Sequence, residues 1–560
     1  MNLIKCLNVL ALVDMPAPFG FDAWLTFWLI LLISAVNGVL MLFTGYKFLQ
    51  IIQLSGYKLK GCFVWLKSTR GKYWGRLLIL SFLSSAALLI TNVLLSDFFY
   101  YKIMAYSGLL FYLLFSIVFI TNMYNAPQKT PLKYTKRMNR LCFVLFLVVF
   151  TFTFLIMTAS SLYIPYFDFG AVGLTPALLP IMVVIAYYIT LPFEALNSLR
   201  YVKNAQKKLS TIKNIKVVGI TGSYGKTSVK NILNTILSEK YNVCATPFSY
   251  NTPLGLSKTI LQNLKETDQI FIAEMGAKNV GDIDYLCKMV KPDVGIITGI
   301  GNQHLATFGS LENLINTKKE LLDNLTKDGK AFVNTESEGA KRLFENANCQ
   351  KYEININNTN NSLCVTNIKT SKNGSSFKLK YANEEIDVTT SLLGKHNISN
   401  ILLCSYVALS LGMTLKEIVG GISKLTPSAH RLALVPSANS LIVIDDAYNG
   451  SVEGAKAALE VLKEFDGQKI IITPGLVELG AEEFDSNFKL GMEIAKVCDY
   501  VIINGVVNYE ALYNGLEFAN FDTKKILRAG SLSQATEVLS TISKPGDVVL
   551  FENDLPDNYT

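Results

Sequence analysis

The chain has 560 residues, a mean hydropathy of +0.31 and a formal net charge of +8 at pH 7. This length allows about three or four domains of roughly 150 residues each. With only 17% charged residues, the chain is too apolar for a wholly soluble protein. Residues 1–193 hold 14 Lys/Arg and 4 Asp/Glu, a net of +10, whereas the rest hold 38 and 40, a net of −2. The positive charge therefore belongs to the apolar part, and no nucleic-acid partner is expected.

Five uncharged apolar runs stand out in the first 200 residues. Each is about as long as a helix needs to be to span a membrane. No Asp, Glu, Lys, Arg or His occurs within them, which argues against a proton or ion relay. The predicted spans cover residues 23–46, 77–95, 103–124, 141–163 and 171–193.

The loops between these runs predict their orientation. Residues 47–76 carry seven Lys/Arg and no acid, and residues 129–140 carry five and no acid. Because positive loops stay in the cytoplasm, five spans place the N-terminus outside and residue 194 onward inside. We therefore expect a multi-pass cell-membrane protein. Two roles remain open for its spans, a plain anchor and a groove for a lipid-linked substrate or partner.

The stretch VVGITGSYGKTSVK at residues 217–230 predicts a phosphate-binding loop. A short apolar strand leads into a glycine turn, and Lys226 opens a helix. Backbone N–H groups in such a turn and the helix N-terminus favour a polyphosphate, which Lys226 can reach. The Thr227 hydroxyl is placed for Mg²⁺. Ile220 stands where the common pattern has its first glycine, and an ordinary glycine turn is the alternative interpretation.

Further polar residues follow predicted strands. Glu274 ends the strand at residues 270–273, and ligands bind outside the carboxyl ends of parallel strands, so a metal ligand is expected there. The three histidines, His304, His396 and His430, each stand in a polar motif between apolar segments, and we expect a functional role for each. From residue 441 onward, strands alternate with helices, which predicts a parallel, Rossmann-like sheet.

The ordered motifs GITGSYGKTS, YNTPLG, EMGA, HLATFGS, KKEL, GKHNISN, HR and DDAYN resemble the Mur ligase family. These enzymes are ATP-dependent amide ligases that build the peptidoglycan stem peptide. The resemblance covers roughly residues 214–550, and EMGA and DDAYN are most similar to the MurF type. The apolar runs predict an α-helical membrane region at 1–200, and the resemblance implies that α/β structure follows it. This would comprise a P-loop central ATP-binding domain at 201–425 and a Rossmann-like C-terminal domain at 426–560.

The resemblance also implies roles for individual residues. The ATP phosphates would be held by Gly222, Ser223, Gly225, Lys226, Thr227 and Ser228, with Asn251 nearby. One Mg²⁺ would be bound by Thr227 and Glu274, and His304 would help to bind a second. Lys318 matches a carbamylated lysine whose carbamate is a further metal ligand. The nucleotide would also meet Asn334, Asn397, Asn400, Arg431 and Asp446, with Arg431 at the phosphates and Asp446 at the ribose. Of these, Lys226, Lys318, His304 and Arg431 would be catalytic.

One of these assignments conflicts with the local sequence. Lys318 stands beside Lys319 and Glu320, and this pattern alone favours an exposed charge on a helix surface.

The sequence departs from the MurF pattern in its substrate-recognition parts. Gly450, Ser451 and Val452 stand where that pattern has Ala-Asn-Pro, and its late Lys-Gly-Ser is absent. Predicted spans replace the domain that grips a UDP-sugar. Near the end of the chain, Glu552, Asp554 and Asp557 either bind an incoming ammonium group or form a solvated tail.

The leading hypothesis is a membrane-anchored MurF-like ligase with cytoplasmic catalytic domains. ATP would phosphorylate the acceptor carboxylate, and an amine would attack the acyl phosphate, with metals, Lys226 and Arg431 balancing charge. Expected partners are a UDP-linked or lipid-linked cell-wall precursor, an amino acid or dipeptide, and membrane lipid. The alternatives are a ligase acting on a lipid-linked precursor or other polymer, an ATP-driven transporter, and an inactive ligase that serves as a scaffold.

Overall fold

The structure is a computed structural model. It describes residues 23–68, 72–93, 112–121, 131–163, 172–301, 305–437, 440–448, 450–477 and 479–553. The chain divides into two compact units, Met1–Asn197 and Ser198–Thr560.

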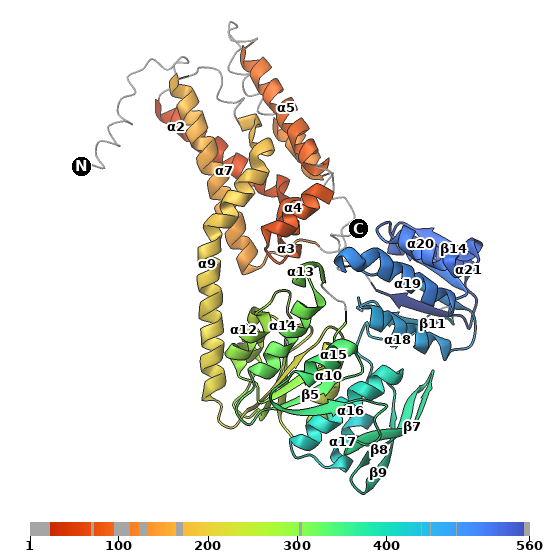
Figure 1. The fold of residues 1–560 in the computed structure, drawn as a ribbon. Helices are drawn as coiled ribbons and strands as arrows, with labels where there is room; N and C mark the ends of the chain where they lie inside the picture. Colours follow the sequence, from red (N-terminus) through yellow and green to blue (C-terminus); the bar gives the residue numbers. More distant parts are fainter. Residues whose placement is uncertain are drawn as a thin grey trace. The chain divides into compact units, whose positions relative to one another are not determined.

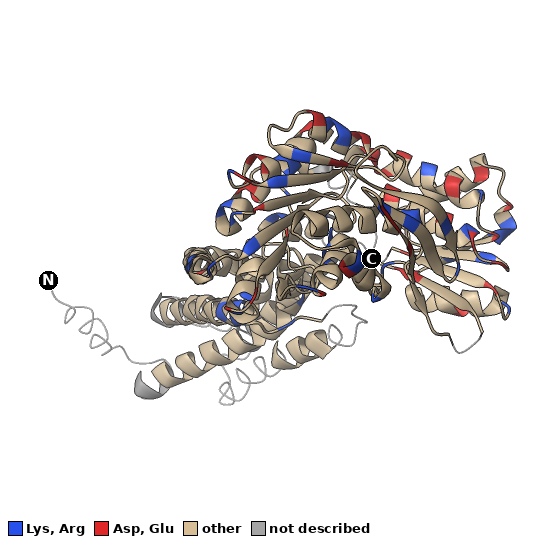
Figure 2. Cartoon of the chain, turned by 90° about the horizontal axis from the view of Figure 1, so that it is seen from below, with Lys and Arg blue, Asp and Glu red and all other residues tan. Residues whose placement is uncertain are grey.

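The first unit is helical (Figure 1). A shorter apolar helix at Tyr112–Thr121 accompanies the labelled ones. The labelled helices are α2 (Ala23–Thr44), α3 (Tyr46–Leu54), α4 (Leu59–Ser68), α5 (Lys72–Val93), α7 (Lys136–Tyr163) and α9 (Thr175–Thr211), the last of which continues into the second unit. Figure 2 shows few charged residues along these helices.

Within the described residues, three helices are long and apolar enough to cross a membrane, at Phe27–Thr44, Lys136–Ala159 and Thr175–Thr211. They coincide with the first, fourth and fifth predicted spans. The second predicted span overlaps α5 and the third overlaps Tyr112–Thr121, and the remainder of both lies outside the described residues. The predicted orientation in the membrane stays a prediction.

A buried polar cluster joins the helices of this unit. The Asn37 side-chain amide on α2 donates to Thr153 Oγ1 on α7 at 2.9 Å and to Thr175 Oγ1 on α9 at 3.3 Å. The Tyr112 hydroxyl donates to Asn37 Oδ1 at 2.6 Å. All four side chains are buried, and such bonds between helices are a recognised source of packing specificity in membranes.

The second unit begins with a parallel six-stranded sheet in the order β2-β3-β1-β4-β5-β6. Its strands are β1 (Lys216–Thr221), β2 (Val243–Ala245), β3 (Ile270–Glu274), β4 (Val294–Ile297), β5 (Lys330–Asn334) and β6 (Gln350–Ile354). The helices that follow or flank them are α10 (Lys226–Leu237), α11 (Pro253–Gln262), α12 (Asp282–Val290), α13 (Leu305–Phe308), α14 (Leu311–Asp323), α15 (Glu338–Glu345), α16 (Lys395–Ser410) and α17 (Leu415–Ser423).

Both faces of this sheet are covered, because side chains of a strand alternate between its two faces. Val217 of β1 belongs to one apolar cluster, which also contains residues of α11, α12, α14 and the end of α9. Val218 and Ile220 belong to another, with residues of α10, α16 and α17. A sheet buried on both faces explains the continuous apolar run that marks β1 in the sequence.

An antiparallel three-stranded sheet packs on the second of these clusters. It consists of β7 (Leu363–Ser371), β8 (Gly374–Tyr381) and β9 (Glu384–Thr390). No helix or strand was predicted for this stretch.

The C-terminal part holds a second six-stranded sheet in the order β10-β11-β15-β12-β13-β14, parallel except for β10. Its strands are β10 (Ala433–Val435), β11 (Ile442–Asp446), β12 (Lys469–Thr473), β13 (Tyr500–Asn504), β14 (Ile526–Ala529) and β15 (Val548–Glu552). Its helices are α18 (Val452–Lys463), α19 (Glu483–Ala495), α20 (Tyr509–Phe518) and α21 (Leu532–Ile542), with short 3₁₀ turns η1 (Gly480–Glu482) and η2 (Thr523–Lys525). The predicted alternation of strands and helices is thereby confirmed.

Candidate active site

The glycine turn between β1 and α10 has the backbone that the motif requires. Gly222 has φ 154° and Gly225 has φ 76°, and a Cβ on Gly222 would collide with Thr298 Oγ1. The turn is held to β4 and the loop after it, because Ser223 N–H donates to the Gly299 carbonyl at 2.8 Å and Thr298 Oγ1 donates to the Tyr224 carbonyl. The structure thus builds a fixed glycine cradle at the start of a helix, where anions are favoured.

Lys226 lies within this cradle. Its Nζ donates to the carbonyl oxygens of Gly222 at 2.7 Å and Ser223 at 2.8 Å. Burial lowers the pKa of Lys226 to about 8, a shift that Glu274 opposes and Arg431 reinforces. The lysine therefore stands where it can meet a phosphate, in an environment that makes its uncompensated charge costly.

The Glu274 carboxylate at the end of β3 lies beside the first turn of α10. The Thr227 hydroxyl donates to Glu274 Oε1 and Oε2 at 3.2 and 3.1 Å. The side-chain amide of Asn251 donates to Oε1 at 3.3 Å. The structure therefore brings these three residues together, and their roles toward metal and phosphate stay predictions.

Hydroxyl and carboxylate oxygens are the donors that Mg²⁺ prefers, and Mg²⁺ commonly takes only one or two carboxylates together with substrate phosphates. Thr227 and Glu274, next to a phosphate cradle, match that requirement. Within the described ranges, this site included, no group of three or more His, Cys, Asp or Glu side chains gathers for a metal. His304, predicted as a ligand of a second metal ion, lies outside them.

Lys318 is not the exposed helix charge that its neighbours in the sequence suggest. Its side chain on α14 is 3% exposed. Burial and the nearby Lys226 lower the pKa of Lys318 to about 7. The interpretation from the local pattern is wrong, because the apolar periodicity of α14 turns this position inward while Lys319 pairs with Asp323 at the surface.

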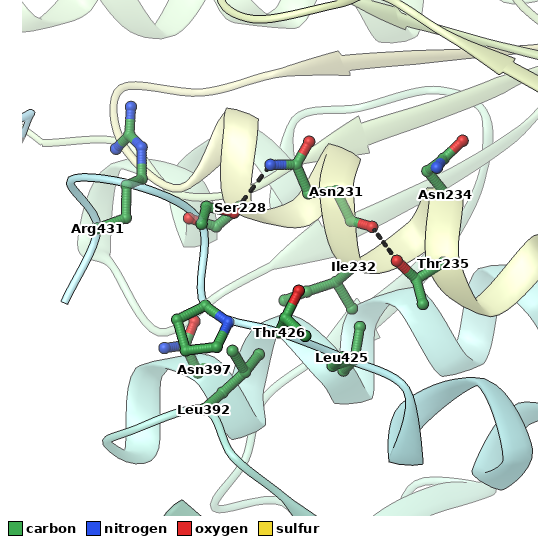
Figure 3. A pocket seen from close by; sticks show the side chains of 12 residues that line it. Ser228, Asn231, Ile232, Asn234, Thr235, Leu392, Asn397, Leu425, Thr426 and Arg431 are labelled. Carbon is green, nitrogen blue, oxygen red and sulfur yellow. Dashed lines mark hydrogen bonds between the residues drawn. The ribbon is translucent and has the colours of Figure 1, made fainter. Parts of the chain in front are cut away.

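A pocket lies between α10, the start of α16 and the segment at residues 425–431 (Figure 3). Two of the predicted nucleotide residues, Asn397 and Arg431, line it, together with Ser228 from the phosphate loop. Asn231 of α10 donates to Ser428 Oγ at 2.9 Å across it. The pocket thus extends from the phosphate loop along one side of α10.

The other predicted nucleotide residues do not line this pocket. Asn400 Oδ1 comes within 3.7 Å of where a Cβ on Gly225 would lie. Asn334 donates to Ser399 Oγ at 3.0 Å, which ties β5 to α16. Asp446 is buried and accepts a hydrogen bond from the Leu432 N–H at 3.1 Å. Their roles toward a nucleotide stay predictions.

The remaining candidates at the end of the chain differ. Glu552 is buried at the end of β15, directly opposite Asp446 on β11, so it does not belong to a solvated tail. Asp554 and Asp557 lie outside the described residues.

The two described histidines have different environments. Burial lowers the pKa of His396 to about 4, which keeps it neutral, whereas His430 Nδ1 lies 2.7 Å from Asp445 Oδ2.

Two residues that the sequence analysis did not single out belong to the site. Lys230 is buried, and its Nζ lies 3.0 Å from Glu274 Oε2. The Tyr224 ring occupies the space beside Gly299, where a Cβ would collide with it at 2.6 Å. Lys230 follows Lys226 by four residues on the same helix, and residues at that spacing share a face, so the pattern contained the signal.

Comparisons with known proteins agree with this geometry. The Mur ligase middle domain matches residues 220–408, and the Mur ligase, glutamate ligase domain matches residues 430–552. The UDP-N-acetylmuramoyl-tripeptide--D-alanyl-D-alanine ligase of Buchnera aphidicola subsp. Baizongia pistaciae is 35% identical over 271 residues, covering 48% of this chain and 58% of its own. The chain spans about three fifths of the length of the curated relatives it matches first.

Solved structures give the same result. MurF from Acinetobacter baumannii superposes with a TM-score of 0.58 at 26% identity, covering 64% of this chain and 77% of its own. MurF ligase from Thermotoga maritima, in complex with ADP, gives a TM-score of 0.57 at 26% identity, covering 64% and 80%. The two matched domains follow each other along the chain, and the first contains the glycine turn. The chain therefore belongs to the Mur ligase family.

Proposed function

We propose that this chain is an ATP-dependent amide ligase of peptidoglycan precursor synthesis, similar to MurF. The observation that carries the proposal is the contact of Thr227 with Glu274 at the mouth of the glycine cradle. A carboxylate and a hydroxyl placed there can hold the metal of a metal–nucleotide complex. The MurF of Thermotoga maritima, which shares the fold, has been solved with ADP, and this supports ATP as the nucleotide.

In the proposed reaction, a carboxylate oxygen of the acceptor attacks the γ-phosphorus of ATP, and the bond to ADP breaks. The amine then attacks the acyl phosphate, loses a proton, and expels inorganic phosphate. Lys226 and Arg431 bring positive charge to the phosphoryl group in transfer. A bound Mg²⁺ would neutralise further charge on that group.

Lys318 supports a further feature that the family resemblance implies. Only a neutral amine can add to carbon dioxide, and burial beside Lys226 lowers the pKa of Lys318 to about 7. A substantial fraction of the side chain is therefore neutral near physiological pH. We propose that it carries a carbamate, whose oxygens would complete the metal site.

The relatives support a choice of acceptor and donor, because their name specifies a UDP-N-acetylmuramoyl-tripeptide and D-alanyl-D-alanine. We propose the same classes here, a cell-wall precursor and a dipeptide or amino acid. The three long apolar helices support a location at the membrane, and the basic loops support catalysis on its cytoplasmic side.

A second candidate is a ligase of the same chemistry that acts on a lipid-linked precursor or another polymer. The apolar helices favour it, because they would keep the catalytic domains near a membrane-bound acceptor.

The test uses the full chain reconstituted in vesicles, with ADP release and amide product measured for each acceptor. A UDP-linked tripeptide with D-alanyl-D-alanine should stimulate both, and Lys226→Ala should abolish both. Lys288→Ala is the matched control, since Lys288 only forms a surface pair with Asp284. Stimulation by lipid-linked acceptors alone would favour the second candidate. Amide formation without consumption of ATP would overturn both.

A further inference from the structure

Lys230 is an unusual residue because a lysine is almost never fully buried unless it is paired. Its side chain on α10 is 2% exposed. Its Nζ donates to Glu274 Oε2 at 3.0 Å and also to the backbone carbonyl of Phe248. One ammonium group thus holds both a candidate metal ligand and a segment that follows β2.

The Glu274 end of this connection is closely constrained. The carboxylate is 1% exposed, so its charge needs a partner, and Lys230 is the cation that meets it. Thr227 and Asn251 donate to the same carboxylate. A divalent cation that binds Glu274 through Oε2 shares this oxygen with the Lys230 ammonium, and the two positive charges repel each other.

The Phe248 end is strained and exposed. Phe248 has φ 49°, a conformation that bulky residues rarely adopt, and its side chain is 81% exposed. Asn251 in the same segment contacts Glu274 as well, and its carbonyl accepts the Gly276 N–H at 2.8 Å. An exposed aromatic ring held by strained backbone beside a reaction site is a candidate substrate contact.

We propose that Lys230 is a positioning residue that couples Glu274 to the segment 248–251. Binding of a divalent cation at Glu274 then changes the position of the exposed Phe248 ring. When the cation binds Glu274 Oε2, the Lys230 ammonium shifts toward the Phe248 carbonyl and displaces the segment 248–251. The acceptor would then meet its binding surface only after the metal–nucleotide complex is in place. The proposal rests on the proposed function only in treating Glu274 as a metal ligand.

The test places a reporter at the ring, Phe248→Trp, in the full chain, and follows its emission during Mg²⁺ titration at saturating ADP. The four native tryptophans lie in residues 1–193, and the chain without the reporter gives their contribution for subtraction. We expect a saturable Mg²⁺ response in the reporter chain. Adding Lys230→Met should reduce its amplitude roughly tenfold, the lower end of the loss that follows removal of a residue that orients a metal ligand.

Lys258→Met is the matched control. Lys258 donates to the Tyr250 hydroxyl at 3.0 Å in the same segment without reaching Glu274, so the response should persist. Lys230→Gln keeps a donor for the Phe248 carbonyl without the charge, and it serves if the methionine variant unfolds; it should lose the response equally. An unchanged response in either Lys230 variant would overturn the proposal, as would a reporter chain that binds Mg²⁺ and ADP without any response. No amide product is measured, so failure of the ligase assignment appears separately.

Discussion

The Thr227 hydroxyl lies 3.1 Å from Glu274 Oε2, and this contact joins the first turn of α10 to the end of β3. Thr227 belongs to the phosphate loop, whereas Glu274 ends the neighbouring parallel strand of the same sheet. The contact depends on the register of β1 against β3, in which Ile220 stands opposite Glu274. A single sheet register therefore brings the glycine turn and the Glu274 carboxylate, the proposed phosphate and metal sites, to one point.

Replacing Glu274 with Gln should reduce ligation about 100-fold or more, because a metal's charge stabilisation contributes several kcal/mol and each 1.36 kcal/mol is tenfold. The variant should also unfold at a lower temperature, since Lys230 keeps a buried charge without its counter-ion. Amide formation and thermal unfolding measure the two effects. Asp284→Asn, on the surface of α12, should change neither. Full activity of the Glu274 variant would contradict the site.

Lys318 should make activity depend on bicarbonate and pH. The pKa of Lys318 is about 7, so its neutral fraction rises between about pH 6 and pH 8. Activity with added bicarbonate should rise over that interval, and labelled bicarbonate should be retained by the wild-type chain but not by Lys318→Met. An activity that is indifferent to bicarbonate would refute the carbamate.

The same group predicts a stability effect. Above about pH 7 the unfolded chain binds more protons at Lys318 than the folded chain does, so the free energy of unfolding should rise with pH until the ordinary pKa of 10.5. Lys318→Met should flatten this rise in denaturant titrations performed at several pH values.

For Glu552 we expect the free energy of unfolding to change with pH in the opposite direction. Burial and the neighbouring Asp446 raise the pKa of Glu552 well above 4.5. Its stabilisation is therefore complete below about pH 4.5 and is lost as the pH rises toward the folded-state value. Glu552→Gln should stabilise the fold at neutral pH and remove this slope. Glu482→Gln, in the short turn before α19, is a suitable comparison.

The polar cluster in the helical unit should matter for stability but not for catalysis. Asn37→Ala removes bonds to Thr153, Thr175 and Tyr112, and hydrogen bonds between membrane helices contribute about 0.6 kcal/mol each, with a maximum near 1.7. Thermal unfolding of the protein in detergent should fall, with the rate of ADP release per folded molecule unchanged. An unaltered melting temperature would show that the cluster contributes nothing measurable.

The sequence predicted the site best where several constraints meet in a few residues. The glycine turn, Lys226, Thr227 and Glu274 all lie at ends of parallel strands, and strand ends in such sheets converge on one edge. The predicted strand at residues 270–273 matches β3 to within one residue, because an apolar run buried on both faces has clear limits.

The sequence predicted less where a residue's surroundings come from distant parts of the chain. The charge of Lys318 looked exposed beside Lys319, although its spacing from the apolar residues of α14 places it on the face of the helix that packing buries. Strands β7 to β9 alternate between buried and exposed residues, and Asn373-Gly374 stands at the turn between the first two, so a hairpin signal was present in the sequence and was overlooked. The spacing of Lys230 from Lys226 was visible in the sequence, but its partners, Glu274 and Phe248, come from elements that only folding brings together.

The two hydrogen bonds from Lys226 to the carbonyls of Gly222 and Ser223 tie the glycine turn to itself. A glycine-rich segment loses more conformational entropy on ordering than any other. Here that loss occurs during folding, not during ligand capture. An arriving polyphosphate therefore meets a rigid receptor, and more of its interaction energy remains available as affinity.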